Sequence, residues 1–88
     1  MNVDVHSLEA ALQALAPEHL EVRDDSHLHA GHAGAQEGSH FGVVIVSPRF
    51  AGLSRIARHR LVYDCVQALI GRGGIHALAI DARAPGES

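Results

Sequence analysis

The sequence predicts a single mixed α+β domain, residues 1–88, in which a three-stranded mixed sheet carries its helices on one face. Three observations support this fold class. The chain has 88 residues, enough for one modest hydrophobic core. Hydrophobic residues make up 47% of it, which is typical of a globular protein. Helical and strand-like patterns follow one another in the order α-β-β-α-α-β.

The first two elements are a helix and a half-buried strand. Asp4 can cap a helix whose apolar face has the spacing i, i+3, i+7. That face comprises Val5, Leu8, Leu12 and Leu15. Pro17 ends the helix. In residues 19–26, polar residues alternate with Leu20 and Val22, which predicts a strand with one exposed face.

Residues 27–39 predict a long, flexible loop. They contain three glycines and, apart from Leu28, no large apolar residue. Loops of this length are often functional. Residues 40–47 are almost continuously apolar and rich in β-branched side chains, and Pro48 ends the run. This pattern predicts a central strand.

The second half of the chain predicts helices followed by a third strand. Ser54 can cap a helical stretch, in which we expect two short helices that meet near Arg58–Arg60. The glycine-rich residues 71–74 end this stretch, since glycine readily adopts left-handed backbone geometry. Residues 75–82 predict the third strand, and residues 84–88 a frayed tail.

The order of these elements brings four histidines to one end of the sheet. The first two strands are joined directly and should be antiparallel, whereas a helical crossover makes the second and third strands parallel. The second and third strands therefore start at the same end, where the 27–39 loop also lies. The histidines expected to converge there are His29, His32, His40 and His76.

Two interpretations of these histidines remain open on the residues alone. Neutral imidazole binds Fe, Zn, Cu and Ni, so convergence favours a metal site. However, His-x-His-x-x-His is not a recognised zinc spacing, and exposed loop histidines are commonly just solvated. His40 could be a strand-edge residue. His76 shares strand parity with Leu78 and Ile80, which favours a hydrogen-bonded core histidine.

The charge composition argues against sequence-independent binding to nucleic acid. The chain has no lysine, and its seven arginines face ten acidic residues, for a formal charge of −3. Protonation of all eight histidines would take that charge to +5, so the surface field depends on pH. A net acidic, lysine-free chain is a poor match for sequence-independent binding to nucleic-acid phosphates.

The apolar runs and the cysteine content indicate where in the cell the protein is expected. The longest apolar run, residues 41–46, is too short to cross a bilayer, and no signal peptide is visible. The lone cysteine, Cys65, cannot form an internal disulfide and has the helical spacing of a core residue. We therefore expect a soluble, cytoplasmic protein with no membrane partner, monomeric as the isolated chain.

Several segments together resemble the BolA family over nearly the whole chain. The most specific is the phrase Phe-x-Gly-x-Ser-x-x-x-Arg-His-Arg-x-Val-Tyr, residues 50–63, followed by the Ile-His-Ala-Leu strand, residues 75–78. Further matching segments are Leu20-Glu21-Val22, Asp25-Ser26 with His29, Ser39-His40-Phe41 and Val46-Ser47.

This resemblance implies a class II KH-like fold and a non-enzymatic function. Family members pair with a monothiol glutaredoxin and share a [2Fe–2S] cluster, to which the glutaredoxin cysteine and glutathione supply sulfur. The histidine of the Ile-His-Ala-Leu strand and one loop residue complete the site. These positions correspond to His76 and His29, with His32 as the local competitor and His40 nearby. We expect the isolated chain to bind no cluster tightly, and a role in cluster trafficking or iron homeostasis.

DNA binding is the alternative function. The resemblance also implies transcription regulation, and residues 54–70 resemble a helix-turn-helix in which Arg55, Arg58, His59 and Arg60 could contact phosphates. However, the Gly-x-x-Gly loop that a KH domain places between its helices is absent, because Gly71–Gly74 follows them. The alternative without a DNA-binding role is that these arginines lie on a solvated helix face or form ion pairs with neighbouring acidic residues.

A hydrolase is the third and weakest hypothesis. It would use Ser54 as nucleophile, His59 as base and Asp64 as its orienting group. Nothing in the sequence places these residues in one cleft, and the glycine-rich elbow of an α/β hydrolase is missing.

Overall fold

The computed structural model describes residues 4–25, 39–70 and 75–87, and at residues 39, 75 and 76 it describes the backbone. The helices are α1 (Val5–Leu12) and α2 (Arg55–Val66), and the strands are β1 (His19–Asp24), β2 (Ser39–Val46) and β3 (Ile75–Arg83). Short 3-10 turns precede or extend these elements: η1 (Gln13–Leu15), η4 (Pro48–Phe50) and η5 (Gln67–Leu69).

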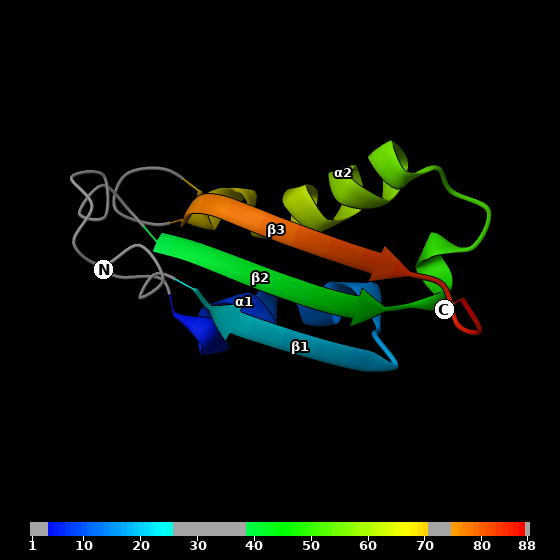
Figure 1. The fold of residues 1–88 in the computed structure, drawn as a ribbon, viewed down its shortest axis with the longest axis horizontal. Helices are drawn as coiled ribbons and strands as arrows, with labels where there is room; N and C mark the ends of the chain where they lie inside the picture. The colour runs from blue at the N-terminus through cyan, green and yellow to red at the C-terminus, as the bar shows by residue number, and fades with distance from the viewer. Residues whose placement is uncertain (1–3, 26–38, 71–74, 88) are drawn as a thin grey trace.

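The three strands form one mixed sheet in the order β1-β2-β3. β1 pairs antiparallel with β2, from His19 opposite Val46 to Asp24 opposite Phe41. β2 and β3 are parallel, and α2 forms the crossover between them. Figure 1 shows both strands running in the same direction, with α2 beside β3. The predicted strand order and directions are therefore confirmed.

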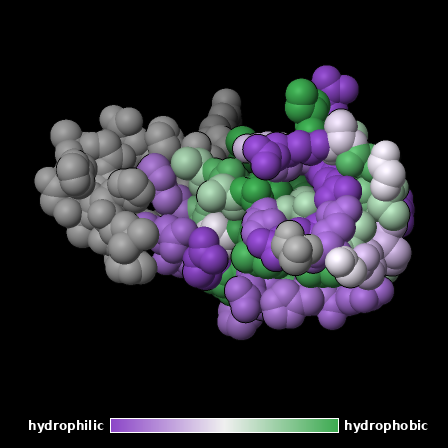
Figure 2. All heavy atoms as spheres, turned by 45° about the vertical axis from the view of Figure 1, so that its right-hand side comes forward, coloured by the Kyte–Doolittle hydropathy of each residue, from purple (hydrophilic) through white to green (hydrophobic). Residues whose placement is uncertain are grey.

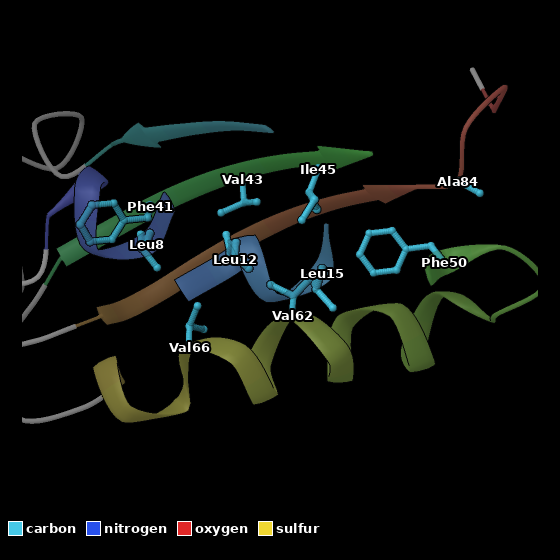
Figure 3. Packing of buried hydrophobic residues seen from close by; sticks show 10 residues of the cluster. All are labelled: Leu8, Leu12, Leu15, Phe41, Val43, Ile45, Phe50, Val62, Val66 and Ala84. Carbon is cyan, nitrogen blue, oxygen red and sulfur yellow. The ribbon is translucent and has the colours of Figure 1, made fainter. Parts of the chain in front are cut away.

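Both helices cover one face of this sheet, as predicted. Phe41, Val43 and Ile45 alternate along β2 and are almost fully buried against the helices (Figure 3). The cluster is completed by Leu8, Leu12, Leu15, Phe50, Val62, Val66 and Ala84. Alternation on β2 and helical spacing on α1 and α2 thus specify the same core. No helix among residues 4–25, 39–70 and 75–87 is long and apolar enough to span a membrane.

The predicted helix caps are both present. The Asp4 carboxylate accepts a hydrogen bond from the Ser7 backbone N–H at 2.9 Å, and the Ser54 hydroxyl accepts one from the Ala57 N–H at 3.1 Å. Each bond satisfies an N–H that has no partner within its own helix, so each cap sets where its helix begins.

The second helical region differs from the prediction. α2 is a single helix that runs through Arg58–Arg60 without a break, so the two short helices expected to meet there are wrong. The caps explain the difference, because Ser54 starts the helix and residues 55–66 contain neither glycine nor proline to stop it. A helix-turn-helix within residues 54–70 is therefore also wrong.

The C-terminal segment also differs from the prediction. Residues 84–87 are ordered by packing and hydrogen bonds rather than frayed. Ala84 is 5% exposed, and its N–H donates to the Glu87 carboxylate at 3.0 Å. The Glu87 N–H donates back to the Ala84 carbonyl at 3.1 Å across a turn in which Gly86 has φ +87°. Glycine suits that left-handed position, so the chain can turn back onto the fold.

Ser47 connects the end of β2 to the end of the first helical segment. Its side chain is fully buried, and its hydroxyl donates to the Leu15 carbonyl at 2.6 Å. The same oxygen accepts from the Arg49 N–H at 3.1 Å and so caps η4. One hydroxyl therefore satisfies two backbone groups that belong to different elements.

We expect Ser47→Ala to lower the free energy of unfolding by about 1–3 kcal/mol, because a buried carbonyl loses its donor. Urea denaturation measures this change. Ser7→Ala is the matched control, since the Ser7 hydroxyl only donates to exposed Asp4, and it should change stability by less than about 0.5 kcal/mol. Equal effects of the two substitutions would contradict the assigned role of Ser47.

Candidate functional site

The starts of β2 and β3 lie side by side at one end of the sheet. Ser39 pairs with Ile75, and His40 pairs with Ala77. The end of β1 lies there too, since the Asp25 N–H donates to the His40 carbonyl at 2.7 Å. Residues 25 and 39, which flank the segment that carries His29 and His32, are consequently both at this end.

His76 occupies an irregular position in the β2–β3 ladder. Because Ser39 pairs with Ile75 and the next residue pairs with Ala77, the register shifts by one residue at His76, as it does at a β-bulge. Bulges of this kind re-aim a side chain and are frequent beside functional sites. The backbones of His40 and His76 are therefore adjacent, as the predicted topology requires.

The two predicted loop histidines, His29 and His32, lie outside the described residues. Within the described part of the chain, no three histidine, cysteine, aspartate or glutamate side chains form a group that could hold a metal ion. The assignment of His29 and His76 as ligands stays a prediction.

The environment of His40 is polar on the face of the sheet away from the helices. The Arg23 guanidinium and the Asp25 carboxylate form an ion pair, with Nε and Oδ1 3.6 Å apart. This pair lies over Gly42, where an added Cβ would collide with the Arg23 guanidinium. Because Gly42 has no side chain, the Arg23–Asp25 ion pair can lie over β2 at this position, two residues along the strand from His40.

Arg58 makes hydrogen bonds and an ion pair within the chain. Its side chain is 15% exposed, and its Nε and Nη1 donate to the carbonyls of Leu53 and Ala82 at 3.0 and 3.2 Å. Its two terminal nitrogens also hold the Glu87 carboxylate at 2.5 and 2.8 Å. These contacts join α2, β3 and the C-terminal segment. The ion-pair interpretation of the arginines therefore applies to Arg58.

The pKa of Glu87 reflects this contact. The hydrogen bonds from Arg58, together with the one from the Ala84 N–H, hold the pKa of Glu87 at about 2, below its ordinary value of 4.5. The nearby Arg83 acts in the same direction. Reciprocally, the Glu87 carboxylate raises the pKa of the Arg58 guanidinium.

Two other candidate DNA contacts, Arg55 and His59, line a pocket between α2 and β3. Arg55 and Arg60 are exposed and His59 is partly buried. The pocket has a volume of about 670 Å³. It is lined by Leu53, Arg55, Arg58, His59, Ile80, Asp81, Ala82 and Arg83. Figure 2 shows hydrophilic side chains gathered over the end of the molecule at which β2 and β3 finish.

Sequence reasoning missed the acidic and basic residues that β3 and the tail contribute to this region. Asp81 accepts two hydrogen bonds from Arg83, at 2.9 and 2.8 Å, and this contact lowers the pKa of Asp81. Residues at i and i+2 on a strand lie on the same face. The spacing of Asp81 and Arg83 in the sequence was therefore a signal for this contact. The partnership of Arg58 with Glu87, 29 residues apart, has no local signal.

The hydrolase arrangement is not formed. The Ser54 hydroxyl caps α2, and five helical residues separate His59 from Asp64, which places them roughly 140° apart around the helix. Cys65 packs against the core, as predicted, and burial raises the pKa of its thiol, which disfavours the reactive thiolate.

We expect the Arg58–Glu87 contact to make stability depend on pH in the acid range. Because the pKa of Glu87 is lowered on folding to about 2, its contribution is complete above the ordinary value of 4.5 and is lost as the pH falls toward 2. Glu87→Gln should flatten the fall in unfolding free energy over that interval, measured by urea denaturation at a series of pH values. Glu18→Gln, at an exposed carboxylate before β1, is the control. Parallel pH profiles for wild type and Glu87→Gln would contradict this role.

The chain is similar to proteins of one family over most of its length. The model of the family described as BolA-like protein matches residues 11–87. The protein of the cobS 5′ region of Sinorhizobium sp is 47% identical over 79 residues, which cover 86% of this chain and 84% of that protein. BolA-like protein 1 of Homo sapiens is 48% identical over 75 residues, which cover 85% of this chain but only 53% of the human protein.

Two solved structures have the same fold. The BolA domain of SufE1 from Arabidopsis thaliana superimposes with a TM-score of 0.80 at 42% identity, covering 98% of this chain and 99% of that domain. BolA1 from Arabidopsis thaliana gives a TM-score of 0.81 at 38% identity, covering 100% of this chain and 98% of that one. The similarity therefore extends through both helices and all three strands described above.

Proposed function

Because the chain belongs to the BolA-like protein family, we propose that it is a non-enzymatic partner of a monothiol glutaredoxin and shares a [2Fe–2S] cluster with it. The cluster is cargo held between the two proteins, and a role in iron–sulfur cluster trafficking or iron homeostasis follows. His76 and His29 are the proposed ligands from this chain, with glutathione and the glutaredoxin cysteine as the other two.

One observation supports this proposal above the rest. The backbone of His76 sits in a bulge at the start of β3, beside His40 and at the same sheet end as residues 25 and 39. Residues 25 and 39 flank the segment that carries the second proposed ligand, His29. The site fits a cluster brought by a partner better than an enclosed metal site within this chain.

The side chains that this chain offers as ligands are also suited to a [2Fe–2S] cluster. Imidazole nitrogens ligate iron in Rieske-type [2Fe–2S] centres, where they replace two thiolates on one iron and raise the reduction potential. Cys65 is a poor competitor as a ligand, because it packs against the core from α2 and its pKa is raised by burial. Histidines are therefore the ligand type that this chain offers a cluster.

His29 and His32 are alternatives for the second ligand. His29 is the fourth residue after Asp25, the last described residue before the segment, and His32 is the seventh. The resemblance to the family favours His29. Replacing each in turn distinguishes them, because only the true ligand changes the iron environment.

The experiment reconstitutes a [2Fe–2S] cluster anaerobically on a monothiol glutaredoxin with glutathione, adds this protein, and records visible absorption and circular dichroism. We expect a new spectrum that is lost with His76→Ala, altered with His29→Ala and unchanged with His32→Ala. His19→Ala is the matched control, since His19 is an exposed histidine at the opposite end of the sheet, paired with Val46.

A spectrum that does not change on addition of the protein would overturn the cluster proposal. DNA binding would then be the leading function, carried by Arg55, His59 and Arg60, because Arg58 already holds Glu87. A salt-dependent mobility shift of duplex DNA at physiological ionic strength would support that alternative.

A further inference from the structure

The pocket between α2 and β3 lies at the opposite end of the sheet from His40 and His76. Its walls come from the first turns of α2 and from Ile80–Arg83, the last residues of β3. Its volume of about 670 Å³ is within the range of sites for small organic molecules. Neither the family resemblance nor the proposed cluster site assigns it a role.

The charges around this pocket favour an anionic ligand. Three guanidinium groups, those of Arg55, Arg58 and Arg83, and the carboxylate of Asp81 line it. The Glu87 carboxylate also binds Arg58, so the cations exceed the carboxylates by one. Asp81 is bound to Arg83, so this pair is internally neutralised. Arg55 is exposed and forms no ion pair with any residue in the described part of the chain.

Arg58 is preorganised to bind an oxyanion. Hydrogen bonds to the Leu53 and Ala82 carbonyls hold its guanidinium in place, and its side chain is only 15% exposed. A guanidinium held in this way loses little side-chain entropy when it binds a carboxylate or phosphate through two parallel hydrogen bonds. The bidentate contact with Glu87 shows this mode of binding directly.

From this geometry we infer that the α2–β3 pocket binds a small organic anion, phosphate or carboxylate, and that Glu87 competes with it for Arg58. The anionic group takes the place of the Glu87 carboxylate on Arg58, with Arg55 as a second cation. Leu53, Ile80 and Ala82 also line the pocket, whose surface is mostly polar. Glu87 is thus an internal ligand that lowers the apparent affinity for the external one.

The tail can release Glu87 without disturbing the pocket. Glu87 is exposed, and the turn that returns it to Arg58 depends on the left-handed backbone of Gly86. The two backbone carbonyls that hold Arg58 belong to residues 53 and 82, outside the tail. Displacement of the Glu87 carboxylate therefore leaves the guanidinium in position for an incoming anion.

The test titrates inorganic pyrophosphate and, separately, citrate into the full chain at low ionic strength and follows the amide resonances of residues 53–59 and 80–83. We expect saturable shifts in wild type. Glu87→Gln should tighten binding about threefold to fivefold, the range of a partly exposed ion pair. Arg55→Gln should weaken binding about fivefold, as expected for loss of one charge-assisted contact.

Arg23→Gln is the matched control for charge. It removes one arginine from β1, where Arg23 is paired with Asp25 at the other edge of the sheet, so it should leave affinity unchanged. Binding of pyrophosphate alone identifies phosphate as the ligand chemistry, and binding of citrate alone identifies carboxylate. Absence of saturable shifts with both probes, or equal affinity in wild type, Glu87→Gln and Arg55→Gln, would overturn the inference. Because glutaredoxin and cluster are absent from the titration, its failure would leave the proposed function untouched.

Discussion

The parallel pairing of β2 and β3 is the constraint on which both candidate sites depend. Two parallel strands need a crossover, and α2 supplies it while burying Val62 and Val66 against the sheet. Parallel strands start together and finish together. Their starts place the backbones of His40 and His76 at the same end of the sheet, and their finish brings the last residues of β3 beside α2. One ladder therefore creates a histidine-bearing end and an arginine-bearing end.

The bulge and the edge position of β3 give these two ends different chemistry. At its start, β3 carries one residue more than β2, and that residue is His76. At its finish, β3 is the edge of the sheet, so its Ala82 carbonyl can accept from Arg58 of the crossover helix.

Local patterns predicted the elements well where apolar spacing was clear and failed where it was interrupted. The alternation of Phe41, Val43 and Ile45 and the caps at Asp4 and Ser54 all appear in the structure as predicted. The polar Arg58-His59-Arg60 run suggested a break in the second helix, because no apolar residue marks the core there. The break is absent because Ser54 caps the helix and residues 55–66 contain neither glycine nor proline, so the helix continues to Val66.

The sequence by itself determined the fold class, the strand directions and the convergence of the strand starts, since periodicity, caps and the crossover rule are properties of local segments. Only the tertiary structure decided the register that makes His76 a bulge residue and the pairing of Arg58 with Glu87. Both depend on contacts between segments far apart in the chain, for which no local preference exists. The same reason explains why the tail was expected to fray and the pocket between α2 and β3 was not foreseen.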